Sequence, residues 1–112
     1  MTAPSDGGTA ARSTAPLPGD LELRRYAAIG RALADPKRLC VVELLAQGER
    51  SVGDLSREAS CQIPNMSQHL AVLRSAGLVA TRREGSTVYY RLADPRVLEA
   101  YRMIRALAGT AG

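Results

Sequence analysis

A group of polar, uncharged side chains occurs near the start of a predicted helix in the middle of the chain. The amides of Asn and Gln can pair bidentately with adenine in the major groove of DNA, whereas the Ser hydroxyl is less selective. Residues 61–73 contain no Arg or Lys, so bidentate reading of guanine from this stretch is not expected. Pro64 shapes the start of the helix. The side chains expected to meet base edges are Gln62, Asn65, Ser67 and Gln68.

Arginines are concentrated after this helix, where two short strands are predicted around the turn Gly85-Ser86. Such a hairpin is a candidate to contact phosphates or to enter the minor groove, and Arg74, near the helix end, is expected to reach a phosphate. Tyr89 and Tyr90 alternate across the second strand, so one is expected in the core and the other can touch the DNA backbone. The alternative is an ordinary solvated hairpin. The expected contact residues of the hairpin are Arg82, Arg83, Ser86 and Thr87.

The net charge of +4 is unevenly distributed along the 112 residues. Residues 1–19 and 20–60 each carry as many acids as bases, whereas residues 61–112 hold seven Arg against three acids. All of the net charge therefore lies in the part that contains the polar helix and the hairpin. This distribution favours a polyanionic partner, with an ordinary Arg-rich surface as the simpler alternative.

The length fits one small domain, and because Phe and Trp are absent, aliphatic residues and four Tyr must build the core. No apolar run approaches the ~20 residues of a membrane span, and the N-terminus lacks the pattern of a secretory signal. We expect a cytoplasmic protein without a membrane partner, whose two cysteines are reduced thiols. Residues 1–19, rich in Gly, Pro, Ser, Thr and Ala, are expected to be a disordered tail before a domain at 20–110.

Apolar residues at spacings of three and four predict four helices before the hairpin. Asp20 is the expected N-cap of the first helix. Asp35 is expected to cap the second helix, with Pro36 at its first position and Gly48 after its end. Ser51 is expected to cap the third helix.

The fourth helix is expected from about residue 63 to residue 76, and the strands at 78–84 and 87–92. Asp94-Pro95 is expected to start a last helix. The predicted buried stripe of the fourth helix is Met66, Leu70 and Leu73.

Three segments occur in an order and spacing that resemble one family. They are ALADPKRLCVVELLAQGERSVGDL, SQHLAVLRSAGLV and REGSTVYYRLADP. They resemble the helix start, the recognition helix and the wing of the ArsR/SmtB family of winged-helix repressors, over about residues 21–108. The resemblance implies a mainly α fold with a β-hairpin wing, a winged helix-turn-helix in the order α-α-α-α-β-β-α. It also implies double-stranded operator DNA as ligand and repression relieved by an inducer.

The resemblance implies a homodimer formed through the first and last helices. The residue pattern agrees, because the apolar faces of these two helices are larger than a small core can absorb. A face shared between two protomers would bury them. The residues expected in this interface are Leu23, Tyr26, Leu33, Val97, Tyr101, Ile104 and Leu107.

Two metal sites of well-known family members have no counterpart in this sequence. Arsenic and cadmium sensors often carry Cys-Val-Cys at the start of the third helix, where this chain has Ser51 and Gly53. Zinc sensors use Asp and His on the last helix, where Asp94 is followed by Arg96 in place of the His, and Glu99 is the other acid. Because zinc needs about four ligands, we expect neither metal site and no cofactor.

Cys40, in the second helix, and Cys61, in the turn before the fourth, are expected to be small buried hydrophobic residues with a structural role. Some relatives respond to reactive sulfur or oxidants through a cysteine pair in the second and last helices. This chain has no cysteine in its last helix, and Cys40 is offset from the usual position. Oxidation or arsenite binding at Cys61 would still tilt the fourth helix. A redox, reactive-sulfur or arsenite sensor through both thiols is therefore the alternative within the family.

His69, the only histidine, fits either DNA contact or a hydrogen-bonded position at the core edge. A metal role would need more partners than one His. With one His, no metal cluster, no Gly-rich phosphate loop and no Cys-His pair at a supportive spacing, an enzyme is not expected. The remaining alternative of another class is a winged-helix protein-interaction module that does not bind DNA. The polar helix and the basic hairpin argue against that alternative.

Overall fold

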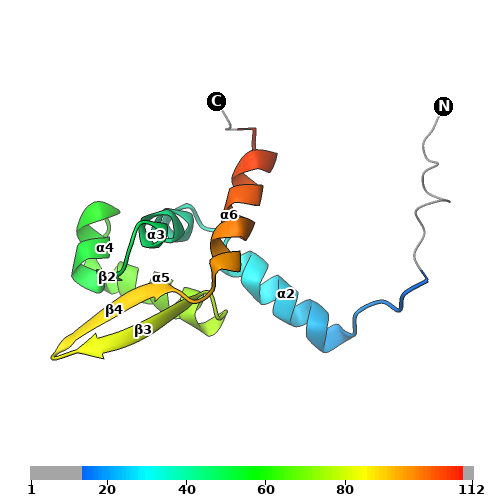
Figure 1. Ribbon diagram of the computed structural model, residues 1–112, viewed down its shortest axis with the longest axis horizontal. Helices are drawn as coiled ribbons and strands as arrows, with labels where there is room; N and C mark the ends of the chain where they lie inside the picture. The colour runs from blue at the N-terminus through cyan, green and yellow to red at the C-terminus, as the bar shows by residue number, and fades with distance from the viewer. Residues whose placement is uncertain (1–13, 110–112) are drawn as a thin grey trace.

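The computed structural model describes residues 14–109, arranged as Figure 1 shows. Residues 1–13 of the predicted tail and residue 110 lie outside the described residues, and residues 14–19 form neither helix nor strand. The elements are α2 (Asp20–Ala32), α3 (Pro36–Ala46), β2 (Arg50–Ser51), α4 (Val52–Glu58), α5 (Ile63–Ser75), β3 (Val79–Glu84), β4 (Thr87–Leu92) and α6 (Pro95–Leu107). None of these helices has the length and apolar character that a bilayer crossing requires. The order confirms the predicted winged helix-turn-helix, with β2 as an addition.

Side-chain caps begin two of the helices where they were predicted. Asp35 Oδ2 accepts hydrogen bonds from the backbone N–H groups of Lys37, at 2.9 Å, and Arg38, at 3.1 Å. Ser51 and Asp54 form a reciprocal capping box at the start of α4. These bonds satisfy N–H groups that have no partner within a helix, and they fix where α3 and α4 begin.

The predicted cap of α2 is wrong by one residue. Gly19 is the N-cap, and its backbone N–H donates to Glu22 Oε1 at 2.7 Å. Asp20 is the first helical residue and pairs with Arg24 at 2.8 Å. A carboxylate is favourable both as a cap and in the first turn, so the sequence does not distinguish the two positions.

Three strands form an antiparallel sheet in the order β2-β4-β3. The hairpin pairs Val79 with Leu92 at its base and Glu84 with Thr87 at its tip, which leaves the predicted two-residue loop. Gly85 in this loop has a φ of 63°, a conformation that glycine adopts at little cost. The strand β2 was missed because two residues are too short to show a periodicity.

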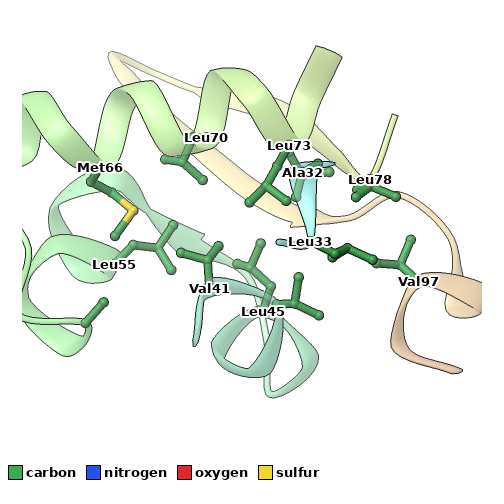
Figure 2. Close-up of a cluster of buried hydrophobic side chains, with 13 residues drawn as sticks. Ala32, Leu33, Val41, Leu45, Leu55, Met66, Leu70, Leu73, Leu78 and Val97 are labelled. Atoms are coloured by element: carbon green, nitrogen blue, oxygen red, sulfur yellow. The ribbon is translucent and has the colours of Figure 1, made fainter. Parts of the chain in front are cut away.

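The core lies where α3, α4 and α5 meet, as Figure 2 shows. Met66, Leu70 and Leu73 lie along one side of α5 above Leu55 of α4 and Val41 of α3. Each of these five side chains is at most 1% exposed, and burial of such a side chain contributes about 1.5–3 kcal/mol. The predicted stripe is confirmed, and its burial fixes which face of α5 is left to solvent.

The helices α2 and α6 extend beyond this core, and α2 projects away from the wing (Figure 1). Leu33 and Val97, predicted in a dimer interface, belong instead to the core of the chain itself, at 8% and 6% exposure. Tyr101 also packs against that core. Part of the apolar face of each helix packs against the core and part stays exposed. Helical spacing alone does not show which apolar residues belong to which part. Large apolar side chains that stay exposed on them are Leu21, Leu23, Tyr26, Ile29, Met103, Ile104 and Leu107.

Candidate nucleic-acid interface

The polar side chains that the sequence singled out lie together on the exposed face of α5. Gln62 is the N-cap and Pro64 lies in the first turn. Asn65, Ser67 and Gln68 are all exposed, on turns whose opposite side is buried. A helix can enter the major groove of DNA and present its N-terminal residues to base edges. The arrangement has the geometry that base reading requires.

The turn between α4 and α5 is held by contacts from both sides. The backbone N–H of Cys61 donates to Ser56 O at 2.9 Å, which ties the turn to α4. The ammonium of Lys37, on α3, donates to Ala59 O at 2.6 Å. Ser60, between Ala59 and Cys61, has a φ of 54°, in the left-handed region. These contacts fix the direction in which α5 starts.

A groove of about 660 Å³ opens between the start of α3, this turn and α5. Its walls carry cationic, amide and hydroxyl groups, and no carboxylate of the described residues lines it. Its lining therefore offers two cationic donors together with amide and hydroxyl groups that can donate or accept, which suits an anionic or polar ligand. The residues that line it are Lys37, Arg38, Ser60, Cys61, Gln62, Asn65, Gln68, His69 and Val72.

His69 faces the start of α3. Its Nδ1 lies 3.3 Å from Nη1 of Arg38 and 3.8 Å from Oδ2 of Asp35. The backbone N–H of Arg38 is the main cause that lowers the pKa of the Asp35 carboxyl, with further contributions from the backbone N–H of Lys37 and from the Arg38 charge. His69 is half-buried, and its contacts correspond to the hydrogen-bonded position at the core edge.

In the wing, Arg82 is engaged by protein groups. Its Nε lies 2.7 Å from Glu49 and its Nη1 lies 2.7 Å from Glu84. Its guanidinium also lies over the ring of Tyr89, at 4.8 Å from the centroid. The hydrogen bonds that Arg82 donates to Glu84 and then to Glu49 raise the pKa of Arg82. A contact between Arg82 and a phosphate would compete with these two carboxylates.

Arg83 differs from Arg82 in its contacts with other side chains. It is exposed, and among residues 14–109 it has no ion-pair partner. It pairs with Val88 across the hairpin, so it lies on the same face as Thr81 and Tyr90 and opposite to Arg82. Tyr90 packs against the core, which confirms that one of the two tyrosines is a core residue. Ser86 is exposed and Thr87 half-buried at the tip of the hairpin.

A second groove, of about 340 Å³, lies between α5 and the wing. Ser67, Arg74 and Ser75 line its helical side, and Tyr90 lines its wing side. Arg74 is exposed near the end of α5, as predicted. The exposed face of α5 is thus bordered by one groove toward α3 and another toward the wing.

Residues 35–81 match the model of the family described as bacterial regulatory protein, arsR family. A biofilm growth-associated repressor of Agrobacterium fabrum is 44% identical over 93 residues, which cover 82% of this chain and 77% of that protein. The chain belongs to the ArsR family. It is a winged-helix transcriptional regulator and not an enzyme.

A solved ArsR-type structure agrees with this assignment. The homodimeric winged helix-turn-helix DNA-binding domain Mb0332 of Mycobacterium bovis matches with a TM-score of 0.76 and 34% identity, over 87% of this chain and 93% of the other. The regulator Rv0324 of Mycobacterium tuberculosis is 38% identical over 86 residues, and this chain spans 38% of its length. The agreement therefore concerns the winged-helix domain.

Residues at the expected ArsR sensing positions have structural roles here. Ser51 caps α4. Asp94 caps α6 by accepting from the N–H of Arg96 at 2.8 Å, and its Oδ2 lies 2.6 Å from Arg96 Nη2. Hydrogen bonds from the side chain and the backbone of Arg96 lower the pKa of Asp94 to about 2. Within residues 14–109, His, Cys, Asp and Glu form no group of three or more that could hold a metal ion.

Cys40 and Cys61 are both half-buried free thiols that pack against the core. Of the two, Cys61 lines the groove beside α5, and its Sγ lies 3.6 Å from Gln62 O. Cys40 lies within α3. The two thiols therefore occupy different surroundings in this ArsR-family domain.

The sequence reasoning missed Lys37 and Arg38. Their side-chain contacts reach Ala59, 22 residues away, and His69, 31 residues away, so no local spacing encodes them. The available signal was their place directly after Asp35-Pro36, in a segment that carries the ArsR resemblance.

Proposed function

We propose that this chain is a dimeric repressor that binds operator DNA sequence-specifically through α5 and leaves it when an inducer acts. The observation that carries the proposal is the orientation of α5. Its apolar stripe is at most 1% exposed, so its amide side chains are left to solvent on the other face. The name of the Agrobacterium relative, a repressor, supports the direction of regulation.

Two kinds of contact have separate roles. The amides of Asn65 and Gln68, with Gln62 and Ser67 beside them, read base edges and give specificity. The guanidinium of Arg83 is a wing cation that is available to phosphates, whereas Arg82 first has to leave two carboxylates. The further proposed backbone contacts are Arg74, Ser86 and Thr87.

The proposed dimer uses α2 and α6. Leu23 and Tyr26 on α2 are 50% and 55% exposed, and Ile104 and Leu107 on α6 are 39% and 81% exposed. Burial of such surface is worth about 25 cal/mol per Å², which favours a partner that covers it. The homodimeric state of Mb0332 supports the same assembly here.

Selection of bound DNA from random duplexes tests the proposal. The expected result is enrichment of a two-fold symmetric site, because a dimer binds two half-sites. The affinity for this site should fall steeply with salt, because each phosphate contact releases counterions. No enrichment, or an affinity independent of salt, would overturn the proposal in favour of a protein-interaction module.

Thiol sensing is a second candidate for release, favoured by the place of Cys61 in the groove beside α5. Modification of Cys61 there would add volume next to Gln62 and tilt α5. Operator complexes of wild type and Cys40→Ser should dissociate with oxidant, persulfide or arsenite, whereas complexes of Cys61→Ser should persist. Release of Cys61→Ser at wild-type reagent concentrations would exclude this mechanism.

A further inference from the structure

The groove between α3 and α5 holds two cations that differ in what they already bind. The guanidinium of Arg38 donates to Ala32 O at 2.7 Å and to Arg31 O at 3.0 Å, and it faces His69 at 3.3 Å. Three of the five N–H donors of Arg38 are thus engaged by protein groups, and these contacts hold the guanidinium toward the end of α2 and His69.

The ammonium of Lys37 makes fewer contacts with the protein than the guanidinium of Arg38. Its ammonium donates one hydrogen bond, to Ala59 O at 2.6 Å, and an ammonium has three N–H donors. The contact with Ala59 places the charge of the Lys37 ammonium next to the turn before α5. Two donors of Lys37 are left for a group that enters the groove.

The surroundings of Lys37 favour an anion. No carboxylate of the described residues lines the groove, and the nearby Asp35 carboxylate caps α3 through two backbone N–H groups. The N-terminus of α5 also borders this groove, and its N-cap residue Gln62 makes no side-chain capping bond. The positive end of that helix dipole thus adds to the Lys37 charge.

We propose that this groove holds one backbone phosphate of the operator, bound by Lys37, next to the bases that Asn65 and Gln68 read. The inference rests on the proposed function and extends it, because it places a phosphate contact on α3, outside α5 and the wing. The three side chains line one groove. A phosphate bound there fixes the position of α5 along the major groove without reading sequence itself.

The salt dependence of operator binding tests the proposal. For Lys37→Gln, the slope of log affinity against log salt should fall in magnitude by about 0.9, the value of one phosphate contact on B-DNA. The preference for operator over unrelated duplex should stay at the wild-type value. Lys37→Arg should keep the wild-type slope, because it keeps the charge.

Arg24→Gln is the matched control, because it also removes one exposed cation, on α2, where Arg24 pairs with Asp20. Its slope should equal that of wild type. A Lys37→Gln slope equal to that of Arg24→Gln would overturn the phosphate site. Equal loss of slope in Lys37→Gln and Lys37→Arg would also overturn it, because charge would then not be the cause.

Lys37 also supports the turn through Ala59, so thermal unfolding of each variant is measured in parallel. Destabilisation without a change of slope assigns Lys37 a structural role and contradicts the proposal. Failure of the proposed function is distinct, because wild-type protein would then show no salt-dependent operator binding. Steep wild-type binding with an unchanged Lys37→Gln slope removes only the phosphate site.

Discussion

His69 Nδ1 of α5 lies 3.3 Å from Arg38 Nη1 of α3, and this contact connects the helix proposed to read DNA to the rest of the domain. The same guanidinium binds the carbonyl oxygens of Arg31 and Ala32, at the end of α2. One side chain thus connects α5 with α3 and with α2, which carries part of the proposed dimer interface. Arg38 is therefore a direct link between α5 and the end of α2.

Substitution of His69 tests this connection. His69→Leu removes the acceptor for Arg38 and should cost about 1 kcal/mol of unfolding free energy. Operator affinity should fall by roughly fivefold, the factor that corresponds to about 1 kcal/mol. His69→Gln should recover most of both, because its amide oxygen can accept from Arg38. Equal losses in the Leu and Gln variants, measured by denaturant unfolding and DNA titration, would contradict this role.

The two wing arginines should differ in their contribution to DNA binding. Arg83→Gln should lower the magnitude of the salt slope by about 0.9, as expected for one lost phosphate contact. Arg82→Gln should change the slope less, because Arg82 is already paired with Glu49 and Glu84. DNA titrations at several salt concentrations measure both slopes. A larger change for Arg82→Gln would show that its ion pairs open on DNA.

Acid should destabilise the domain partly through Asp94. Its pKa is lowered from 3.8 to about 2 in the folded chain, so its contribution to stability is present above about pH 4. The contribution is lost as the pH falls from about 4 through about 2, because Asp94 takes up a proton more readily in the unfolded chain than in the folded chain over this range. Asp94→Asn keeps a capping oxygen without the charge and should show a flatter unfolding profile over this range, at equal protein concentration. Parallel profiles of the two proteins would rule out this role.

A charge placed on the exposed apolar faces should separate the protomers. Leu23→Glu on α2 or Leu107→Glu on α6 should give a monomer in sedimentation experiments, because each places a carboxylate in the proposed interface. Operator affinity should fall about 100-fold or more, since the second half-site is lost. Leu17→Glu, at a residue 89% exposed before α2, is the control and should remain dimeric. A dimeric Leu107→Glu would place the interface elsewhere.

Local sequence determined much of what could be predicted. Asp35 and Ser51 act within three residues of their own positions, and the stripe of Met66, Leu70 and Leu73 follows helical spacing. Caps and stripes of this kind are encoded within one or two helical turns. They were sufficient to predict the exposed face of α5, and the turn Gly85-Ser86 between two strand patterns predicted the hairpin.

Contacts between distant segments were not predictable in this way. Arg82 meets Glu49, 33 residues away, and this pairing engages a guanidinium that was predicted to contact DNA. Arg38 meets His69 31 residues away, and this decides the surroundings of the only histidine. Such pairs depend on how elements pack, for which one sequence contains no periodic signal.

The affinity of Asn65→Ala for the selected operator and for an unrelated duplex tests the central claim most directly. The account predicts that the difference between the two binding free energies shrinks by about 1–3 kcal/mol, the value of one bidentate base contact, so that the ratio of the affinities falls. Affinity for the unrelated duplex and the salt slope should stay unchanged, and Ser75→Ala, at the exposed end of α5, should match wild type. A wild-type ratio in both Asn65→Ala and Gln68→Ala would contradict the claim that α5 reads the operator.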